Sequence, residues 1–133
     1  MSSFTYSPGS SYTPAPLASV LAINGKNTGS TTVYTVPVGK TFFPQYFIIK
    51  LASISGGGST PTLKFKNNTT SLDLMTAVTL TGLTTANYTY NVYTNIAGVT
   101  PGCAENDVIQ MQITSGAGYT TYNIDVHVYG LLI

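Results

Sequence analysis

The sequence predicts an all-β fold, with apolar and polar side chains alternating along strands rather than following a helical repeat. The final segment shows this most clearly, since Tyr122, Ile124, Val126 and Val128 alternate with polar residues. Thr, Val, Ile and Tyr are abundant, and all four favour strands. No segment has a convincing apolar period of 3.6 residues, which argues against helices.

Turn residues divide the chain into eight strand-like segments. These are residues 17–23, 31–36, 41–54, 62–66, 72–80, 87–93, 109–113 and 122–129. Alternation implies sheets with one buried and one solvated face, and two such sheets can bury their apolar faces against each other. Eight antiparallel strands in one domain, residues 17–133, suit a jelly-roll β-sandwich, with other Greek-key sandwiches as the main alternative.

Two of these segments lead to specific expectations. Residues 41–54 contain FFPQYFIIKLASI and predict one long central strand with Pro44 near its start. Residues 72–80 predict a further single strand, with a bulge near Met75. Residues 38–41 end like a phosphate-binding loop but lack its first glycine and are flanked by strands, so they predict a hairpin turn.

The first 16 residues are rich in Ser, Pro, Tyr and Gly and cannot form a packed core alone. They predict an extended N-terminal arm. Either the arm is a disordered tail or it docks on a neighbouring subunit through Phe4, Tyr6 and Tyr12.

The charge of the chain limits its partners. Charged residues make up 7% of the sequence, there is no Arg, and the net charge is +1. Nucleic-acid binding depends on several Lys or Arg contacts to phosphate, and a polybasic membrane anchor needs a cluster of them. We therefore expect neither partner, and near-neutral charge instead favours association with other proteins.

No targeting segment is expected either. The N-terminus lacks a basic segment followed by an apolar run, and no stretch approaches 18 consecutive apolar residues. We therefore expect synthesis in a cytoplasm, without export by the common route.

Catalytic chemistry has few candidates. His127 and Asp125 lie two residues apart on one predicted strand, so their side chains share a face, and Cys103 could pair with His127 as nucleophile and base. Glu105 and Asp107 could contribute to a calcium site. Each pattern is better explained by solvated, interface or packing residues, so we expect no enzyme, cofactor or metal.

The exposed aromatic residues are the stronger signal. Six tyrosines in the C-terminal half cannot all be buried: Tyr88, Tyr90, Tyr93, Tyr119, Tyr122 and Tyr129. Outward tyrosines can anchor a protein interface or stack on sugars, and the interface is the preferred interpretation. With the three aromatic residues of the arm, Tyr93, His127 and Tyr129 are the predicted interface residues.

The segment from Thr32 to Thr41, TVYTVPVGKT, resembles a recurrent stretch of bacteriophage virion-surface proteins. The similarity extends more loosely from about residue 30 to the C-terminus, which ends in Val128-Tyr129-Gly130-Leu131-Leu132-Ile133. The resemblance implies a jelly-roll subunit, often a homotrimer, mounted on a capsid or tail.

The function expected from this resemblance is that of a virion structural protein. A short domain with an arm and no repetitive shaft resembles a capsid decoration (cement) protein, which binds the major capsid protein or another virion protein and stabilises contacts between shell subunits. The alternative is a head- or tail-fibre module that recognises host surface glycan.

Overall fold

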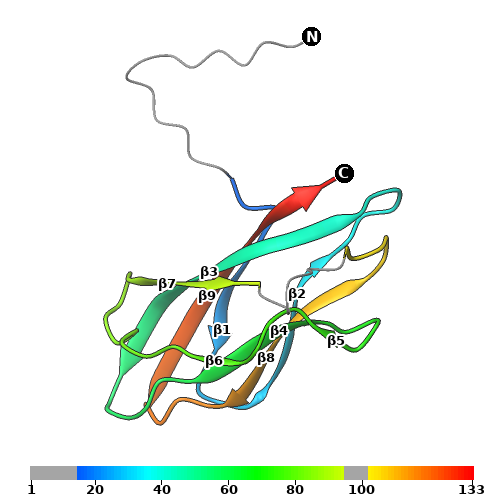
Figure 1. The fold of residues 1–133 in the computed structure, drawn as a ribbon. Coiled ribbons are helices and arrows are strands. Elements are labelled where there is room, and N and C mark those ends of the chain that lie inside the picture. Colours follow the sequence, from blue (N-terminus) through cyan, green and yellow to red (C-terminus); the bar gives the residue numbers. More distant parts are fainter. Residues whose placement is uncertain (1–14, 95–101) are drawn as a thin grey trace, which may run out of the picture.

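The computed structural model describes residues 15–94 and 102–133. Within these ranges the chain forms nine β-strands and no helix (Figure 1). The all-β prediction is confirmed. Across the same residues, no helix is long and apolar enough to cross a bilayer. Phe4, Tyr6 and Tyr12 of the predicted arm lie outside the described residues.

The strands form two antiparallel sheets that face each other in a sandwich-like arrangement. Sheet A has the order β1 (Ala18–Asn24), β9 (Thr121–Leu132), β3 (Phe42–Ser55) and β7 (Thr89–Tyr93). Sheet B has the order β2 (Gly29–Thr35), β8 (Val108–Ser115), β4 (Thr62–Asn67) and β5 (Leu72–Asp73), and β6 (Val78–Thr79) also pairs with β4.

Nine strands are formed rather than eight because residues 72–80 do not make one strand. β5 and β6 are two residues each and pair with opposite ends of β4. Between them Leu74 and Met75 are both buried, which breaks the period of two. Two consecutive buried side chains cannot belong to one regular strand with a single inner face.

The expected hairpin at residues 38–41 is also wrong. A turn does form there, with Lys40 N donating to Pro37 O at 3.2 Å, but β2 and β3 belong to different sheets. After the turn Thr41 pairs with Ile133 and Phe42 with Cys103 through backbone hydrogen bonds, so the chain joins sheet A. The turn therefore links the two layers instead of two neighbouring strands.

The core lies between the two sheets. Phe47 of β3 stacks on Phe65 of β4, with ring centroids 3.7 Å apart, and both side chains are fully buried. The inner faces of the long strands follow the predicted alternation, since β8 and β9 alternate between buried and half-buried positions along most of their length. Burial of these side chains is the main stabilising contribution to the fold.

Pro44 lies inside the long central strand, as predicted, opposite Gly130 of β9. A side chain at position 130 would collide with the carbonyl oxygen of Phe43 and the ring of Phe42. The glycine therefore permits the close approach of β9 to the start of β3. The register shifts by one residue at Gln45 of β3, and beyond this shift Tyr129 and Tyr46 lie opposite each other.

Candidate protein-interaction site

The outer face of sheet A carries a row of three tyrosines, which we call the aromatic row: Tyr129 of β9, Tyr46 of β3 and Tyr93 of β7. The rings of Tyr46 and Tyr129 stack with centroids 4.7 Å apart and planes 9° apart. Tyr93 lies against Tyr46 at 6.0 Å and is 63% exposed. Leu17, which donates its backbone N–H to Val128 O, extends the row to the opposite edge of the sheet.

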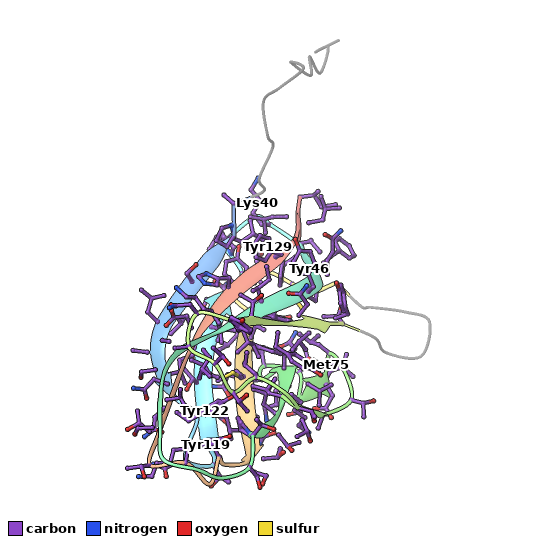
Figure 2. All side chains as sticks on the ribbon, turned by 90° about the vertical axis from the view of Figure 1, so that its left-hand side faces the viewer. Lys40, Tyr46, Met75, Tyr119, Tyr122 and Tyr129 are labelled. Carbon is purple, nitrogen blue, oxygen red and sulfur yellow. The ribbon has the colours of Figure 1, made fainter. Side chains whose placement is uncertain are left out.

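Figure 2 places Tyr46 and Tyr129 at the end of the molecule that also carries Lys40, far from Tyr119 and Tyr122. The aromatic row therefore covers one end of the sheet face rather than all of it. Offset-stacked and tilted tyrosines present apolar rings with polar hydroxyls at their tips. Such a surface suits contact with protein.

The next row on the same face is half polar. Ser19, His127, Ile48 and Asn91 are cross-strand neighbours on the four strands. The Ser19 hydroxyl and His127 Nδ1 are 2.7 Å apart and share a hydrogen bond. This bond orients the imidazole beside the apolar side chain of Ile48, so the row continues the mixed surface below the tyrosines.

Asp125 lies one row further along β9 and has a structural partner. Its Oδ1 accepts the backbone N–H of Ala22 at 2.8 Å, in the bulge of β1 between Val20 and Ile23. Ala22 has a φ of 56°, a left-handed conformation that is strained for a residue with a side chain. The carboxylate thus holds the bulge, and it is not bonded to His127.

The other catalytic pattern is not assembled. Cys103 is buried in the core, whereas His127 lies on the outer face of sheet A, so the two cannot act as nucleophile and base. Burial is the main reason that the pKa of the Cys103 thiol is raised. A thiol that is buried and protonated is a packing residue.

Glu105 and Asp107 also have structural hydrogen-bond partners. Glu105 Oε2 accepts the N–H of Gly39 at 2.8 Å, and Asp107 Oδ2 accepts from Asn67 Nδ2 at 2.8 Å and Ala104 N at 2.9 Å. Among the described residues, no group of three His, Cys, Asp or Glu side chains is placed to hold a metal ion. The two carboxylates tie the turn after β2 and the turn after β4 to the loop before β8.

The outer face of sheet B has a different composition. Its rows are formed by uncharged polar residues and two lysines: Ser30, Thr32, Gln110, Gln112, Lys64 and Lys66. Lys64 pairs with Asp73 at 3.0 Å, and Gln110 Nε2 donates to the Thr32 hydroxyl at 3.4 Å. None of the residues in these rows is aromatic.

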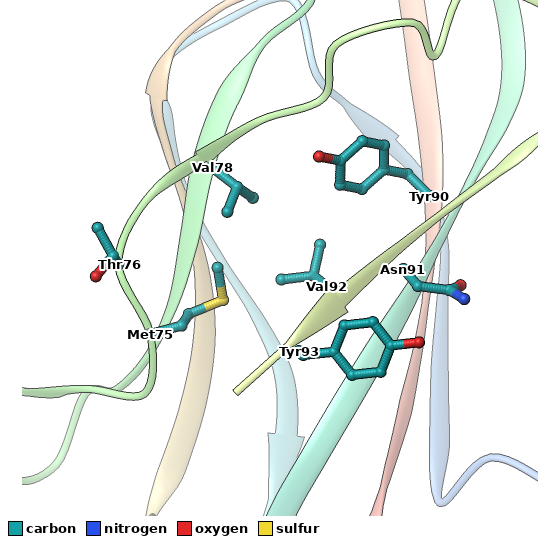
Figure 3. A pocket seen from close by; sticks show the side chains of 7 residues that line it. All are labelled: Met75, Thr76, Val78, Tyr90, Asn91, Val92 and Tyr93. Carbon is teal, nitrogen blue, oxygen red and sulfur yellow. The ribbon is translucent and has the colours of Figure 1, made fainter. Parts of the chain in front are cut away.

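A groove of about 290 Å³ lies where sheet A ends at β7 (Figure 3). It is lined by Met75, Thr76, Val78, Tyr90, Asn91, Val92 and Tyr93. In Figure 3 Met75 approaches from the segment between β5 and β6, Val78 from β6 and Val92 from β7. Small-molecule sites usually occupy roughly 300–1,000 Å³, so this groove is better matched to one or two side chains.

The structure brings together the described part of the predicted site. Tyr93 and Tyr129 belong to one row, and His127 lies in the adjacent row. Sequence reasoning missed Tyr46 and Ile48, because the run FFPQYFIIKLASI was interpreted only as one central strand without assigning its faces. It missed Leu17 because this residue was counted with the first apolar run, residues 17–23. The signal in the sequence was the alternation of the strand. Tyr46, Ile48 and Lys50 occupy every second position, between the fully buried Phe47, Ile49 and Leu51, and therefore share the outer face.

Comparisons with known proteins identify a fold relative. No protein-family model matches the chain, and no curated protein matches it. A chain in the solved structure of the cyanophage Pam1 capsid asymmetric unit is similar over 97% of this chain and 94% of its own length. The TM-score is 0.51 and the sequence identity 17%, so the likeness is one of fold.

Proposed function

We propose that this protein is a bacteriophage virion structural subunit that decorates the outer capsid shell and docks there through the outer face of sheet A. The observation that carries the proposal is the aromatic row, which lies on a sandwich whose fold is similar, over nearly its full length, to a chain of a phage capsid structure. Its partner would be the major capsid protein or another virion protein.

The strand order supports classing the sandwich as a jelly roll. Apart from β5 and β6, which follow β4 within sheet B, consecutive strands alternate between the sheets: β1, β3, β7 and β9 lie in sheet A, and β2, β4 and β8 lie in sheet B. Each sheet thus contains strands that are distant in sequence, and the interleaving is that of two nested Greek keys. A capsid coat often uses this architecture because its edges are short and its faces are free for contacts.

The surface chemistry fits docking on protein. The aromatic row and Ile48 supply apolar area, and Ser19, His127 and Asn91 supply polar contacts around it. Aromatic residues are enriched in the centres of protein interfaces, and charged residues are depleted there. Low net charge removes the repulsion that many copies on one shell would otherwise experience.

We further propose a homotrimer. Three copies of the docking face on one particle bind the shell with avidity, so each contact can be individually weak. The mass of the purified protein in solution tests this directly, and a monomer at the concentrations used for shell binding would contradict it.

The docking face is tested by adding purified protein to capsid shells that lack it and measuring the bound fraction by sedimentation. Tyr129→Ser should weaken binding at least tenfold, because it removes the ring that stacks on Tyr46 in the row. Ser30→Ala on sheet B is the matched control and should bind like the unaltered protein. Equal binding by both variants would exclude the aromatic row as the docking face.

The alternative, a receptor-binding module, predicts a different outcome of the same variants. Binding to isolated host surface glycan that is lost in Tyr129→Ser, without binding to shells, would replace the decoration role. The folded state of each variant is checked by its thermal unfolding midpoint, so that loss of binding is not confused with loss of structure.

A further inference from the structure

The strand β7 forms an edge of sheet A with backbone groups directed away from the sheet. Leu51 N donates to Tyr88 O at 3.0 Å, and Thr94 N donates to Gln45 O at 3.1 Å. These bonds orient the backbones of even-numbered residues toward β3. In an antiparallel ladder the intervening residues then direct their N–H and C=O groups outward. Within the described ranges, no strand pairs with that outer edge.

The groove lies directly beside this edge, so β7 offers two things to an incoming strand. Thr89, Asn91 and Tyr93 offer backbone hydrogen bonds, and the space between Met75 and Val92 takes an apolar side chain. Main-chain bonds to a sheet edge with pockets for alternate side chains are the features of strand addition. As far as residues 15–94 and 102–133 show, this edge is uncovered, and an uncovered edge is a route to uncontrolled aggregation that an occupant would block.

We propose that residues 3–7 of a neighbouring copy of this chain add to β7 as a strand and place Phe4 or Tyr6 in the groove. This segment reads Ser-Phe-Thr-Tyr-Ser, which alternates polar and aromatic residues with a period of two. Phe4 and Tyr6 therefore share one face of an extended strand. Pro8 follows immediately and ends the strand, because proline cannot continue a hydrogen-bonded ladder.

The chemistry of the segment matches that of the groove. Residues 2–16 contain no charged side chain, and the lining of the groove is apolar with uncharged polar groups at Thr76 and Asn91. Docking therefore buries no unpaired charged side chain, which would be costly. Two aromatic residues and a row of backbone hydrogen bonds are sufficient for a contact that many copies repeat.

The length of the intervening chain permits delivery to a second copy. Nine residues, 8–16, span at most about 30 Å when extended. They lead to Leu17 at the β1 edge, and three strand spacings of roughly 4.8 Å separate β1 from β7. Binding to its own β7 would draw the segment across Tyr129 and Tyr46, whereas binding to a neighbour leaves the aromatic row free.

Such a contact is head-to-tail, since the N-terminal segment of one copy meets the β7 edge of the next. A heterologous contact of this kind closes into a ring when the rotation permits, and a trimer is one such ring. The inference deepens the proposed function by naming what holds the trimer together. It is tested on purified protein without shells, so its failure leaves the docking face unaffected.

Disulfide trapping provides the test. The first protein variant carries one cysteine substitution in the N-terminal segment: Ser3→Cys, Thr5→Cys or Ser7→Cys. The second variant carries Asn91→Cys, at an exposed position of β7 on the outer side of the sheet. Cys–Cys bonds form when Cα atoms are about 4.4–6.8 Å apart, the separation of cross-strand neighbours. Mixing the two variants under mild oxidation should give a covalent heterodimer with at least one of the three.

The control replaces Asn91→Cys with Thr32→Cys, an equally exposed strand position on sheet B, and should give at least tenfold less product. No product above this control would overturn the proposal. A further protein carries both cysteine substitutions in the same chain. If it forms a disulfide within that chain while the mixed proteins give no heterodimer, the segment binds its own β7, and the proposed contact between copies is wrong.

A second variant measures the interaction without added cysteines. Phe4→Ser removes one of the two aromatic side chains of the segment and should shift the solution mass from trimer to monomer, and Phe4→Tyr should restore the trimer. If the double variant Phe4→Ser, Tyr6→Ser keeps the solution mass of the trimer, the segment has no role in assembly.

Discussion

The outer faces of the two sheets are both solvated, yet they differ in how their side chains are used. On sheet B, Gln110 bonds to Thr32 and Lys64 pairs with Asp73, so polar groups satisfy one another. On sheet A, Tyr46 stacks on Tyr129, and Tyr93 remains largely exposed beside them. Water readily solvates the first face, whereas the second retains apolar ring area that contact with a protein would bury.

The comparison shows that alternation alone does not identify a docking face. Both sheets place polar or half-polar residues outward at every second position. What distinguishes sheet A is that three of these outward residues, drawn from three strands, are tyrosines in one row. Concentration of aromatic area, rather than the amount of it, makes the face specific.

The prediction with the largest expected effect tests whether the two sheets unfold as one cooperative unit. Phe65→Ala removes the sheet B ring that stacks on Phe47 of sheet A and should lower the free energy of unfolding by roughly 3–5 kcal/mol. Chemical denaturation followed by tyrosine fluorescence and by far-ultraviolet circular dichroism should give coincident transitions. Separate transitions would mean that the sheets fold independently.

The next effect introduces charge on each face. His127→Lys puts an unpaired ammonium beside the aromatic row and should weaken shell binding by at least tenfold, about 1.4 kcal/mol, because docking must desolvate it. Gln112→Lys makes the same addition on sheet B and should change binding less than twofold. Equal losses, measured by sedimentation with shells, would place docking on both faces.

A smaller effect separates two tyrosines of the same strand. Tyr122 of β9 points inward, is fully buried, and donates its hydroxyl hydrogen to Leu83 O at 2.6 Å. Tyr122→Phe should lower the free energy of unfolding by roughly 1 kcal/mol at neutral pH without changing shell binding. Tyr129→Ser should instead weaken shell binding and leave the free energy of unfolding nearly unchanged.

The pH dependence of Tyr122→Phe sharpens this prediction. Burial, with the nearby Tyr119 as a smaller cause, raises the pKa of Tyr122 to about 12 from 10.0. The unfolded chain therefore loses this proton at lower pH than the folded chain does. The contribution of the Tyr122 hydroxyl to the free energy of unfolding is complete below pH 10 and is lost as pH rises toward 12. Between pH 10 and 12 the unaltered protein should therefore lose stability more steeply than Tyr122→Phe. Parallel stability curves above pH 10 would contradict the assignment.

The smallest effect belongs to the ion pair on sheet B. Asp73→Asn removes the partner of Lys64, and because both side chains are solvent-accessible, the cost should be below about 0.5 kcal/mol. Urea unfolding of the two proteins should give nearly superimposable curves. A cost above 2 kcal/mol would show that sheet B depends on specific polar contacts more than its exposure suggests.

Sequence reasoning succeeded where one strand contains the whole signal. The alternation of β9 predicted that Tyr122 faces inward and Tyr129 outward, and the burial pattern confirms both. It failed at residues 72–80, where the adjacent residues Leu74 and Met75 are both buried between the short strands β5 and β6. It also missed Asn67, which is buried and joins Asp107, because an Asn in a turn predicts only local bonds.

The sequence by itself determined which side chain of each strand faces inward, because the period of two is a local property of extended backbone. Only the tertiary structure decided which strands are neighbours. Leu17, Tyr46, Tyr93 and Tyr129 come from four separate segments and form one row only after β1, β9, β3 and β7 pair in register. Strand pairing joins residues distant in the chain, and no local pattern encodes it.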